Sequence, residues 1–347
     1  MKVCIVIDGV SNSGGTDRVV SNLANILTEK EISTDIYSLT TGAPYYFISS
    51  EVRIIYPKYN NRIINLINFS IKIKKENYDN VIVLSMGKLS AQLIPMLRIF
   101  LIKSKIICND HVSFESFSLI KKMIKLPAYF ISDNIVVLTE SDKSYLKNML
   151  GSKVSVVRNS SPYENYSFSS NDIYKKEKIV IAVGRLTYQK NFQRLIRLWN
   201  EAKTIGWRLV IIGSGEEKEI LEDSIRQNKS NNINIIESTP DLEKWYRRSS
   251  LLLMTSRYEG LPMVLIEAKN FALPVLAFDC KTGPNEIIDK DGIVIDYHDD
   301  QSFILNLERI LVDSELREKF SKEALLNSKF FNKEEIFKQW GLVLNSK

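Results

Sequence analysis

Residues 253–268 read LMTSRYEGLPMVLIEA. The apolar run that begins this stretch is short enough for a buried strand, and Pro262 favours the first turn of a helix. The loop between them carries Glu259 and Gly260. A strand, a loop and a helix in this order are typical of open parallel sheets, in which ligands bind beyond the carboxyl ends of the strands. The stretch therefore predicts an α/β fold and the sheet edge at which chemistry is expected.

The same alternation continues on both sides of this stretch. Short runs rich in Val and Ile alternate with longer amphipathic segments, which predicts parallel sheets joined by crossover helices. In the first half the predicted strands are Val3–Ile7, Asp35–Leu39, Val52–Tyr56, Val81–Leu84, Lys105–Cys108, Ile135–Leu138 and Val154–Val157, and in the second half they are Ile179–Val183, Leu209–Ile212, Ile233–Ile236, Leu251–Met254, Val275–Phe278 and Ile293–Ile295. The predicted fold class is therefore α/β, with two doubly wound Rossmann-like domains.

A polar stretch, SPYENYSFSSNDIYKKE, separates the two series of strands. It lacks an apolar period, so residues 161–177 are predicted to be a linker. We place one domain at residues 1–160 and the other at 178–330. Residues 331–347 have a helical pattern with no further strand, and we expect this last helix to pack back on the first domain.

Composition excludes several classes of protein. The 347 residues are more than one ordinary core organises. Three scattered cysteines without a C-x-x-C pair, and only two histidines, argue against a disulfide framework and a structural metal site. The longest lipid-like stretch, residues 91–102, contains Pro95 and Arg98 and is shorter than the ~20 residues that span a bilayer. We therefore expect a cytoplasmic protein that does not cross a membrane.

The positive charge lies in the first half. Residues 1–160 hold 20 basic and 13 acidic residues, a net charge of +7, and residues 58–125 hold 12 basic residues against 4 acidic ones. Within this region apolar residues recur at helical spacing with lysines to their side; the apolar residues are Leu119, Met123, Leu126 and Phe130, and the lysines are Lys121, Lys122 and Lys125. Tyr129 adds an aromatic group that suits an interface.

A basic amphipathic surface attracts anionic lipid headgroups. We therefore expect an anionic membrane surface as a partner of the first domain, with the protein peripheral at the inner face of the membrane. The alternative is a solvated helix whose apolar stripe faces its own core. No nucleic-acid motif accompanies the charge, so no nucleic-acid partner is expected.

Two carboxylates flank the predicted helix start in residues 253–268. The free N–H groups at the helix start would form a site for an anion or a hydroxyl group; these residues are Leu261, Met263 and Val264. Glu267 lies five residues after Pro262, about 7.5 Å along a helix axis. A nucleotide sugar could use Glu259 for sugar hydroxyls and Glu267 for ribose hydroxyls. Taken singly, each glutamate could equally be a loop residue or a helix-dipole partner.

Cations follow another predicted strand. Residues 179–191 read IVIAVGRLTYQKN, in which Gly184 ends the strand and Arg185 and Lys190 bracket the next loop. A diphosphate needs compensating positive charge, and these side chains could supply it from one loop. The alternative is that both are simply solvated.

Weaker signals follow three more strands. Gly14 and Gly15 open space before a helix that Thr16 or Asp17 could cap. Gly213 follows a strand in the second half, and His111 follows one in the first. No G-x-G-x-x-G motif is present, so a nicotinamide site is not expected.

Together these segments resemble the GT-B retaining glycosyltransferases of family 4 over nearly the whole chain. The resemblance rests on GGTDRVVSNLA (14–24), VGRLTYQKN (183–191), IIGSGEEKEILE (211–222) and above all EGLPMVLIE (259–267), with its two glutamates separated by seven residues. FDCKTGPNEII (278–288) is similar to members that assemble bacterial surface polysaccharides. Asn191 and Ala272 stand where the family often has glycine, and neither departure removes a charge.

The resemblance implies a GT-B fold whose two domains face a central cleft. The catalytic residues it implies are Arg185, Lys190, Glu259 and His111. The donor-binding residues it implies are Gly14, Gly15, Gly184, Gly213, Gly260, Leu261, Pro262, Met263, Val264 and Glu267. The base of the nucleotide would lie near residues 237–241. No metal and no cofactor other than the nucleotide-sugar substrate are implied.

The expected function is transfer of a hexose or N-acetylhexosamine, with retention, from a nucleotide sugar to a lipid-linked saccharide. UDP is favoured over GDP, and the product would belong to a surface polysaccharide such as O-antigen or capsule. Two alternatives stay open: a nucleotide-sugar epimerase of GT-B architecture and a noncatalytic nucleotide-sugar-binding partner.

Overall fold

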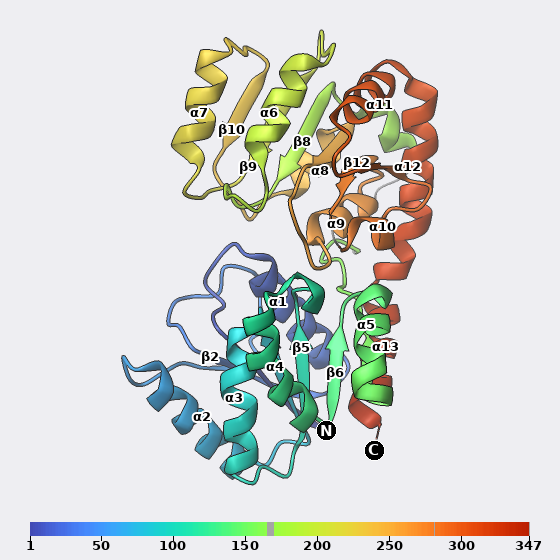
Figure 1. The fold of residues 1–347 in the computed structure, drawn as a ribbon. Helices are drawn as coiled ribbons and strands as arrows, with labels where there is room; N and C mark the ends of the chain where they lie inside the picture. The colour runs from blue at the N-terminus through green and yellow to red at the C-terminus, as the bar shows by residue number, and fades with distance from the viewer. Residues whose placement is uncertain (165–169, 281, 347) are drawn as a thin grey trace. The chain divides into compact units, whose positions relative to one another are not determined.

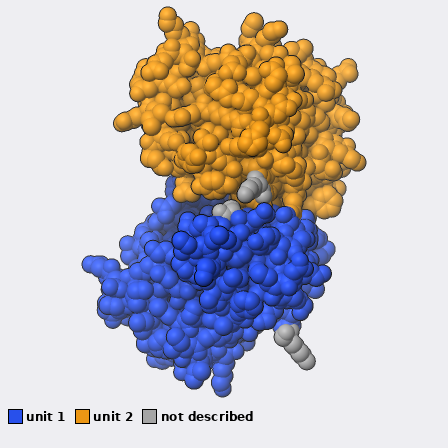
Figure 2. Space-filling view, in the orientation of Figure 1, with its two compact units in different colours: residues 1–160, 333–347 blue, residues 161–332 orange. Residues whose placement is uncertain are grey.

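The computed structural model describes residues 1–164, 170–280 and 282–346. The chain divides into two compact units: residues 1–160 together with 333–347 form unit 1, and residues 161–332 form unit 2 (Figure 2). Each unit has its own hydrophobic core and its own parallel sheet. The predicted α/β fold class is confirmed.

Unit 1 contains a seven-stranded parallel sheet in the order β3-β2-β1-β4-β5-β6-β7. Figure 1 labels β2, β5 and β6 of this sheet. Its strands are β1 (Lys2–Ile7), β2 (Ser33–Ser38), β3 (Arg53–Ile55), β4 (Asn80–Ser85), β5 (Lys105–Asp110), β6 (Asn134–Val137) and β7 (Val154–Val156). Its helices are α1 (Gly15–Glu29), α2 (Arg62–Glu76), α3 (Lys88–Ile99), α4 (Leu119–Ile131), α5 (Glu140–Leu150) and α13 (Lys333–Asn345), with short 3₁₀ turns at Phe114–Ser116 and Gly151–Lys153. The strand order reverses between β1 and β4, which is where an open α/β sheet forms its binding crevice.

Unit 2 contains a six-stranded parallel sheet in the order β10-β9-β8-β11-β12-β13. Its strands are β8 (Ile179–Val183), β9 (Arg208–Ile212), β10 (Ile233–Ile236), β11 (Leu251–Met254), β12 (Val275–Asp279) and β13 (Gly292–Asp296). Its helices are α6 (Phe192–Glu201), α7 (Lys218–Gln227), α8 (Glu243–Arg248), α9 (Met263–Asn270), α10 (Pro284–Ile287), α11 (Asp300–Val312) and α12 (Ser314–Ser328), with 3₁₀ turns at Ser170–Lys175 and Lys329–Phe331. Here the order reverses between β8 and β11.

All thirteen predicted strands are present, with ends that match or differ by at most two residues. They were visible in the sequence because the strands of a parallel sheet are buried on both faces and therefore read as continuous apolar runs. In β4, for example, all six residues are buried. The middle of the predicted linker, residues 165–169, lies outside the described residues.

The orientation of α4 differs from the expectation for two of its residues. Lys125 is buried and pairs with Asp110, rather than lying on a basic surface. Tyr129 is also buried, and its hydroxyl donates to Asp110 at 2.5 Å, so it serves the core of unit 1 and not an interface. Helical spacing identifies the residues that share a face, but it does not say which face meets the sheet.

The start of α1 also differs. Its N-cap is Gly14, with no side-chain capping bond, and neither Thr16 nor Asp17 takes that place. The Asp17 carboxylate accepts instead from the backbone N–H of Asn12 at 2.9 Å, which closes the loop that precedes the helix. Among the described residues, no helix is long and apolar enough to span a bilayer.

Candidate active site

The reversal point of the unit 2 sheet brings together the loops that follow β8 and β11. Lys190 closes the first loop and Glu259 lies in the second, and the Lys190 Nζ–Glu259 Oε1 distance is 2.6 Å. Their side chains are only 16% and 8% exposed, respectively. Because these residues lie 69 positions apart in the chain, only the fold could join them.

Backbone contacts hold the two loops in register. The N–H of Arg257 donates to the carbonyl of Gln189 at 2.8 Å, and the Gln189 side-chain amide donates to the carbonyl of Tyr258 at 2.9 Å. These bonds join the residue just before Lys190 to the two residues just before Glu259, so they hold the two loops together next to the charged pair.

The β9 loop approaches the β8 loop very closely. A Cβ atom on Gly213 would lie 1.9 Å from the carbonyl oxygen of Gly184, so no larger residue fits there. The N–H of Leu186 donates to the carbonyl of Ser214 at 3.0 Å. The predicted donor residues Gly184 and Gly213 are therefore brought together by the fold, and their N–H groups donate to the carbonyls of Ile212 and Ile236.

The start of α9 lies where an anion or hydroxyl site is predicted. Pro262 is the N-cap residue and makes no side-chain capping bond. Among the described residues, no group accepts from the backbone N–H of Met263 or Val264. Gly283, at φ +100°, packs against this loop, and a Cβ there would lie 2.6 Å from the carbonyl oxygen of Gly260. Unpaired N–H groups at a helix start favour a negatively charged or hydroxyl ligand.

The second glutamate of the pair has a different environment. Glu267 is buried in α9, and the Tyr246 hydroxyl donates to its Oε2 at 2.8 Å. Tyr246 is itself buried and stacks on Phe271, with ring centroids 5.4 Å apart. The Glu267 carboxylate is thus held in place from α8, the helix before its own.

Arg185 is the exposed cation of the site. It lies between Gly184 and Leu186 and forms no ion pair with any residue that the structure describes. Its charge is therefore available to a ligand, whereas that of Lys190 is shared with Glu259.

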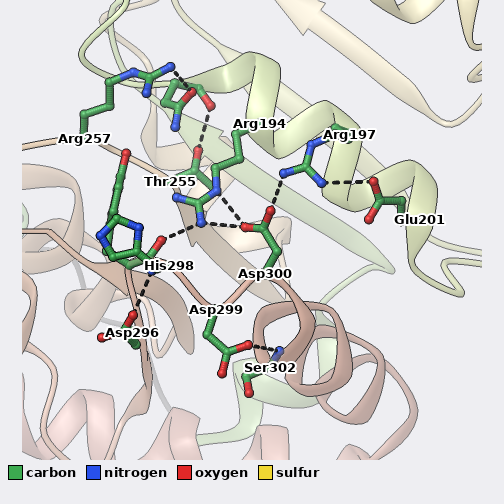
Figure 3. A network of polar contacts seen from close by, with 12 residues as sticks. Arg194, Arg197, Glu201, Thr255, Arg257, Asp296, His298, Asp299, Asp300 and Ser302 are labelled. Atoms are coloured by element: carbon green, nitrogen blue, oxygen red, sulfur yellow. Dashed lines mark hydrogen bonds and ion pairs between the residues drawn. The ribbon is translucent and has the colours of Figure 1, made fainter.

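A second group of arginines fixes the helix that follows the β8 loop. Figure 3 shows Arg194 and Arg197 of α6 pointing toward Asp300 at the start of α11. Arg194 Nε lies 2.8 Å from Asp300 Oδ1, and the Arg257 guanidinium donates to Asn191 Oδ1 at 2.9 Å. These residues line a surface cavity of about 560 Å³ that includes neither Arg185 nor Lys190. Because its arginines already have partners, we assign this network to the positioning of α6.

The remaining predicted site residues lie in unit 1. Gly14 and Gly15 stand at the start of α1, and a Cβ on Gly15 would meet nothing within 4 Å. His111 directly follows β5 and is buried, and its Nε2 lies 2.7 Å from Asn109 Oδ1. Burial lowers the pKa of His111 to about 4, although the nearby Asp110 carboxylate opposes the shift. The imidazole is therefore neutral at neutral pH.

Two partners of the predicted residues were missed from the sequence. Asn109 lies two positions before His111, a spacing that puts both side chains on the same face of a strand, so the sequence did hold a signal for it. Tyr246, the partner of Glu267, lies 21 positions away on another helix, and no local pattern points to it.

Comparisons with known proteins point to one family. Residues 164–326 match the family described as "Glycosyl transferases group 1". The chain is 44% identical over 349 residues, 99% of each chain, to the "Amylovoran biosynthesis glycosyltransferase AmsD" of Erwinia amylovora. It is 25% identical over 358 residues, 98% of this chain and 97% of the relative, to the "GalNAc-alpha-(1->4)-GalNAc-alpha-(1->3)-diNAcBac-PP-undecaprenol alpha-1,4-N-acetyl-D-galactosaminyltransferase" of Campylobacter jejuni.

Solved structures show the same fold at low sequence identity. HepE of Anabaena, in complex with UDP-glucose, matches with a TM-score of 0.84 at 16% identity and covers 100% of both chains. TarM of S. aureus matches with a TM-score of 0.82 at 15% identity, covering 99% of this chain and 100% of its own. These likenesses establish the two-domain GT-B fold.

Proposed function

This chain belongs to the glycosyl transferases group 1 family, and from that premise we propose that it moves a hexose or N-acetylhexosamine from a nucleotide sugar to a lipid-linked saccharide. The observation that carries this proposal is the Lys190–Glu259 pair, which lies beside Gly260 and precedes the uncapped start of α9. We assign the enzyme to the retaining, metal-independent glycosyltransferases of family 4. The donor is proposed to be a UDP-sugar, with a GDP-sugar as the alternative.

The relatives support the proposed acceptor and pathway. AmsD is named for the biosynthesis of amylovoran, and the Campylobacter relative is named for transfer to an undecaprenol-linked saccharide. A basic first domain fits an acceptor that carries phosphate groups and a lipid. We therefore place the chain in the assembly of a surface polysaccharide such as O-antigen or capsule.

In the proposed reaction the acceptor hydroxyl oxygen attacks the anomeric carbon of the donor sugar. The bond from that carbon to the phosphate oxygen breaks, and the departing nucleoside diphosphate keeps the electron pair. A phosphate oxygen on the same face takes the acceptor proton, so the configuration at the anomeric carbon is retained. No carboxylate acts as a nucleophile in this scheme.

Each site residue has a role in that reaction. Arg185 and Lys190 neutralise the charge that grows on the departing diphosphate, as preorganised donors do where charge develops. The N–H groups of Met263 and Val264 bind donor oxygens, Glu259 orients the sugar, and Glu267 binds the ribose. His111, neutral because it is buried, accepts a hydrogen bond from a sugar hydroxyl.

Substitution of Arg185 tests this assignment. Arg185→Ala should lower the rate of transfer by roughly 100-fold, because one charge-stabilising donor is lost. The readout is release of nucleoside diphosphate with a membrane extract as the source of acceptor. Lys203→Ala removes another exposed cation from unit 2, between α6 and β9, and should leave the rate unchanged. An Arg185→Ala enzyme with wild-type turnover would reject the role.

Incubation with the donor alone separates the two alternatives from the proposal. An epimerase would interconvert the free nucleotide sugar without an acceptor. A noncatalytic partner would bind the donor and release no nucleoside diphosphate with any extract. A transferase should release it only when the acceptor is present, or far more slowly by hydrolysis.

A further inference from the structure

Helix α4 of unit 1 presents its apolar face to solvent. Leu119, Ile120, Met123 and Ile124 are 79%, 71%, 73% and 62% exposed, respectively. Placed at about 100° per residue, these side chains fill an uncharged arc of about 140° on the helix. A surface helix ordinarily turns such a stripe toward the core, so this orientation requires a cause.

The cause is the ion pair on the opposite face of the helix. Lys125 pairs with Asp110 at the end of β5, and both side chains are almost fully buried. The Lys125 ammonium also donates to Ser90 Oγ at 2.5 Å, and the Tyr129 hydroxyl donates to Asp110. Rotation of α4 to bury the apolar stripe would leave a carboxylate buried without its partners, which is strongly unfavourable. The fold therefore holds the apolar face outward.

Further exposed apolar side chains continue this face at the end of α3. The Arg98 guanidinium donates to the backbone carbonyl of Ile131 at 2.9 Å, which joins the last turns of α3 and α4. Beside this contact Ile99 and Leu101 are both exposed, as is Phe130 on α4. We call these residues, together with the four on the first half of α4, the α4 face.

The charge around the α4 face is positive. Lys121 and Lys122 flank the arc on α4, and residues 58–125 as a whole carry 12 basic residues against 4 acidic ones. Two copies of this chain meeting through the face would bring like charges together, because residues 1–160 carry +7. A surface that is apolar and negatively charged at its boundary fits better, and anionic phospholipid provides both properties.

We propose that the α4 face docks unit 1 on an anionic membrane surface. The helix lies in the plane of the interface, with Leu119, Ile120, Met123 and Ile124 among the acyl chains next to the headgroups and with Lys121 and Lys122 at the level of the phosphates. At about 20 Å, its 13 residues are too short to span a bilayer. The inference goes beyond the proposed function, since docking requires no sugar donor and no saccharide acceptor.

Co-sedimentation of the full chain with vesicles tests the proposal. The protein should bind vesicles of phosphatidylglycerol and phosphatidylcholine, and bind pure phosphatidylcholine much more weakly. Ile120→Asp with Met123→Asp should lower binding by more than about tenfold, because apolar groups are replaced by charges that the interface repels. Lys121→Gln should lower binding to anionic vesicles by roughly fivefold.

The matched control carries the same chemical change elsewhere. Ile205→Asp with Val312→Asp replaces two highly exposed apolar residues of unit 2 and alters the net charge equally. Two added negative charges weaken binding to anionic vesicles wherever they lie on the surface. This variant should show that general loss and no more. Equal losses in both double variants would overturn the proposal. So would sedimentation of the wild-type chain as a dimer that the α4 double variant dissociates.

A labelled cysteine provides a second readout that does not depend on a disruptive variant. The native cysteines, Cys4, Cys108 and Cys280, are all buried, so Met123→Cys can be labelled selectively with an environment-sensitive dye. Its emission should shift to the blue on addition of anionic vesicles, whereas a dye at Ile205→Cys should not respond. An unchanged spectrum at position 123 in the presence of bound vesicles would refute insertion of α4.

Discussion

The imidazole of His111 is held in one tautomer by its neighbours. The Asn109 side-chain amide donates to the carbonyl of Val136 at 3.5 Å, which leaves Asn109 Oδ1 to accept from His111 Nε2–H at 2.7 Å. Nδ1 of His111 then carries the lone pair. Under the proposed function this atom can accept a hydrogen bond from a sugar hydroxyl, and Asn109 acts as a positioning residue.

The pKa of His111 provides a direct test. The chain has two histidines, so His298→Gln leaves His111 as the only one in a nitrogen-labelled NMR spectrum. From pH 7.5 to 5.5 we expect the neutral imidazole, with its one N–H hydrogen on Nε2. The titration midpoint should lie near pH 4. Asn109→Asp should raise the midpoint, because a carboxylate stabilises the imidazolium. A midpoint near the ordinary value of about 6.5 would contradict this account.

The lowered pKa of His111 also makes the free energy of unfolding depend on pH. The unfolded chain takes up this proton near pH 6.5, whereas the folded chain takes it up only near pH 4. The free energy of unfolding therefore falls as the pH is lowered through this window, and His111 contributes no further loss below it.

At the scale of elements, α4 shows how a single buried pair decides which side of a helix meets the sheet. The apolar residues of α4 outnumber its lysines. Lys125 nevertheless faces the core, because its ammonium group pairs with the buried carboxylate of Asp110 at the end of β5. A buried carboxylate that loses its partner costs more than the exposure of a few apolar side chains. The helix is fixed by its polar contact, and its apolar face is left for an external partner.

Lys125→Met measures the strength of that contact. It leaves Asp110 buried without a cation, so the free energy of unfolding should fall by about 3–5 kcal/mol. Lys121→Met makes the same chemical change at an exposed position of the same helix and should alter stability by less than about 0.5 kcal/mol. Urea denaturation of both variants gives the comparison, and equal effects would mean that the pair does not anchor α4.

At the scale of the whole molecule, the chain leaves unit 1 at Ser160 and returns to it at Lys333. The ends of unit 2 lie together, because the N–H of Ser161 donates to the carbonyl of Phe331 at 2.9 Å. The returning helix α13 buries Ile336 and Trp340 in unit 1. Unit 2 is thus an insertion with adjacent ends, whereas unit 1 is built from two separate parts of the sequence.

This organisation predicts different behaviour for two excised polypeptides. Residues 161–332 should fold alone, and under the proposed function UDP should raise their melting temperature. Residues 1–160 should be much less stable than the same residues joined to 333–347 through a short Gly/Ser connection, because the loss of a buried aromatic residue alone costs about 3–5 kcal/mol. Circular dichroism melting curves compare them. Identical melting curves with and without α13 would contradict the assignment of this helix to unit 1.

The sequence alone determined the strands, the α/β class and the loops that carry the site. Strands buried on both faces require continuous apolar runs, and the close approach of Gly213 to Gly184 requires glycine, so both features are recorded locally. Arg185, Lys190 and the two glutamates could be proposed as ligands of a diphosphate and a sugar because their spacing resembles that of a known family.

Only the tertiary structure decided which of these residues meet. Lys190 reaches Glu259 across 69 residues, Tyr246 reaches Glu267 from another helix, and Asp110 turns Lys125 inward. A periodic pattern states which side chains share a face, but the energy of burying a charge depends on what lies opposite it. That opposite group is supplied by a distant part of the chain, so it exists only once the sheet has formed.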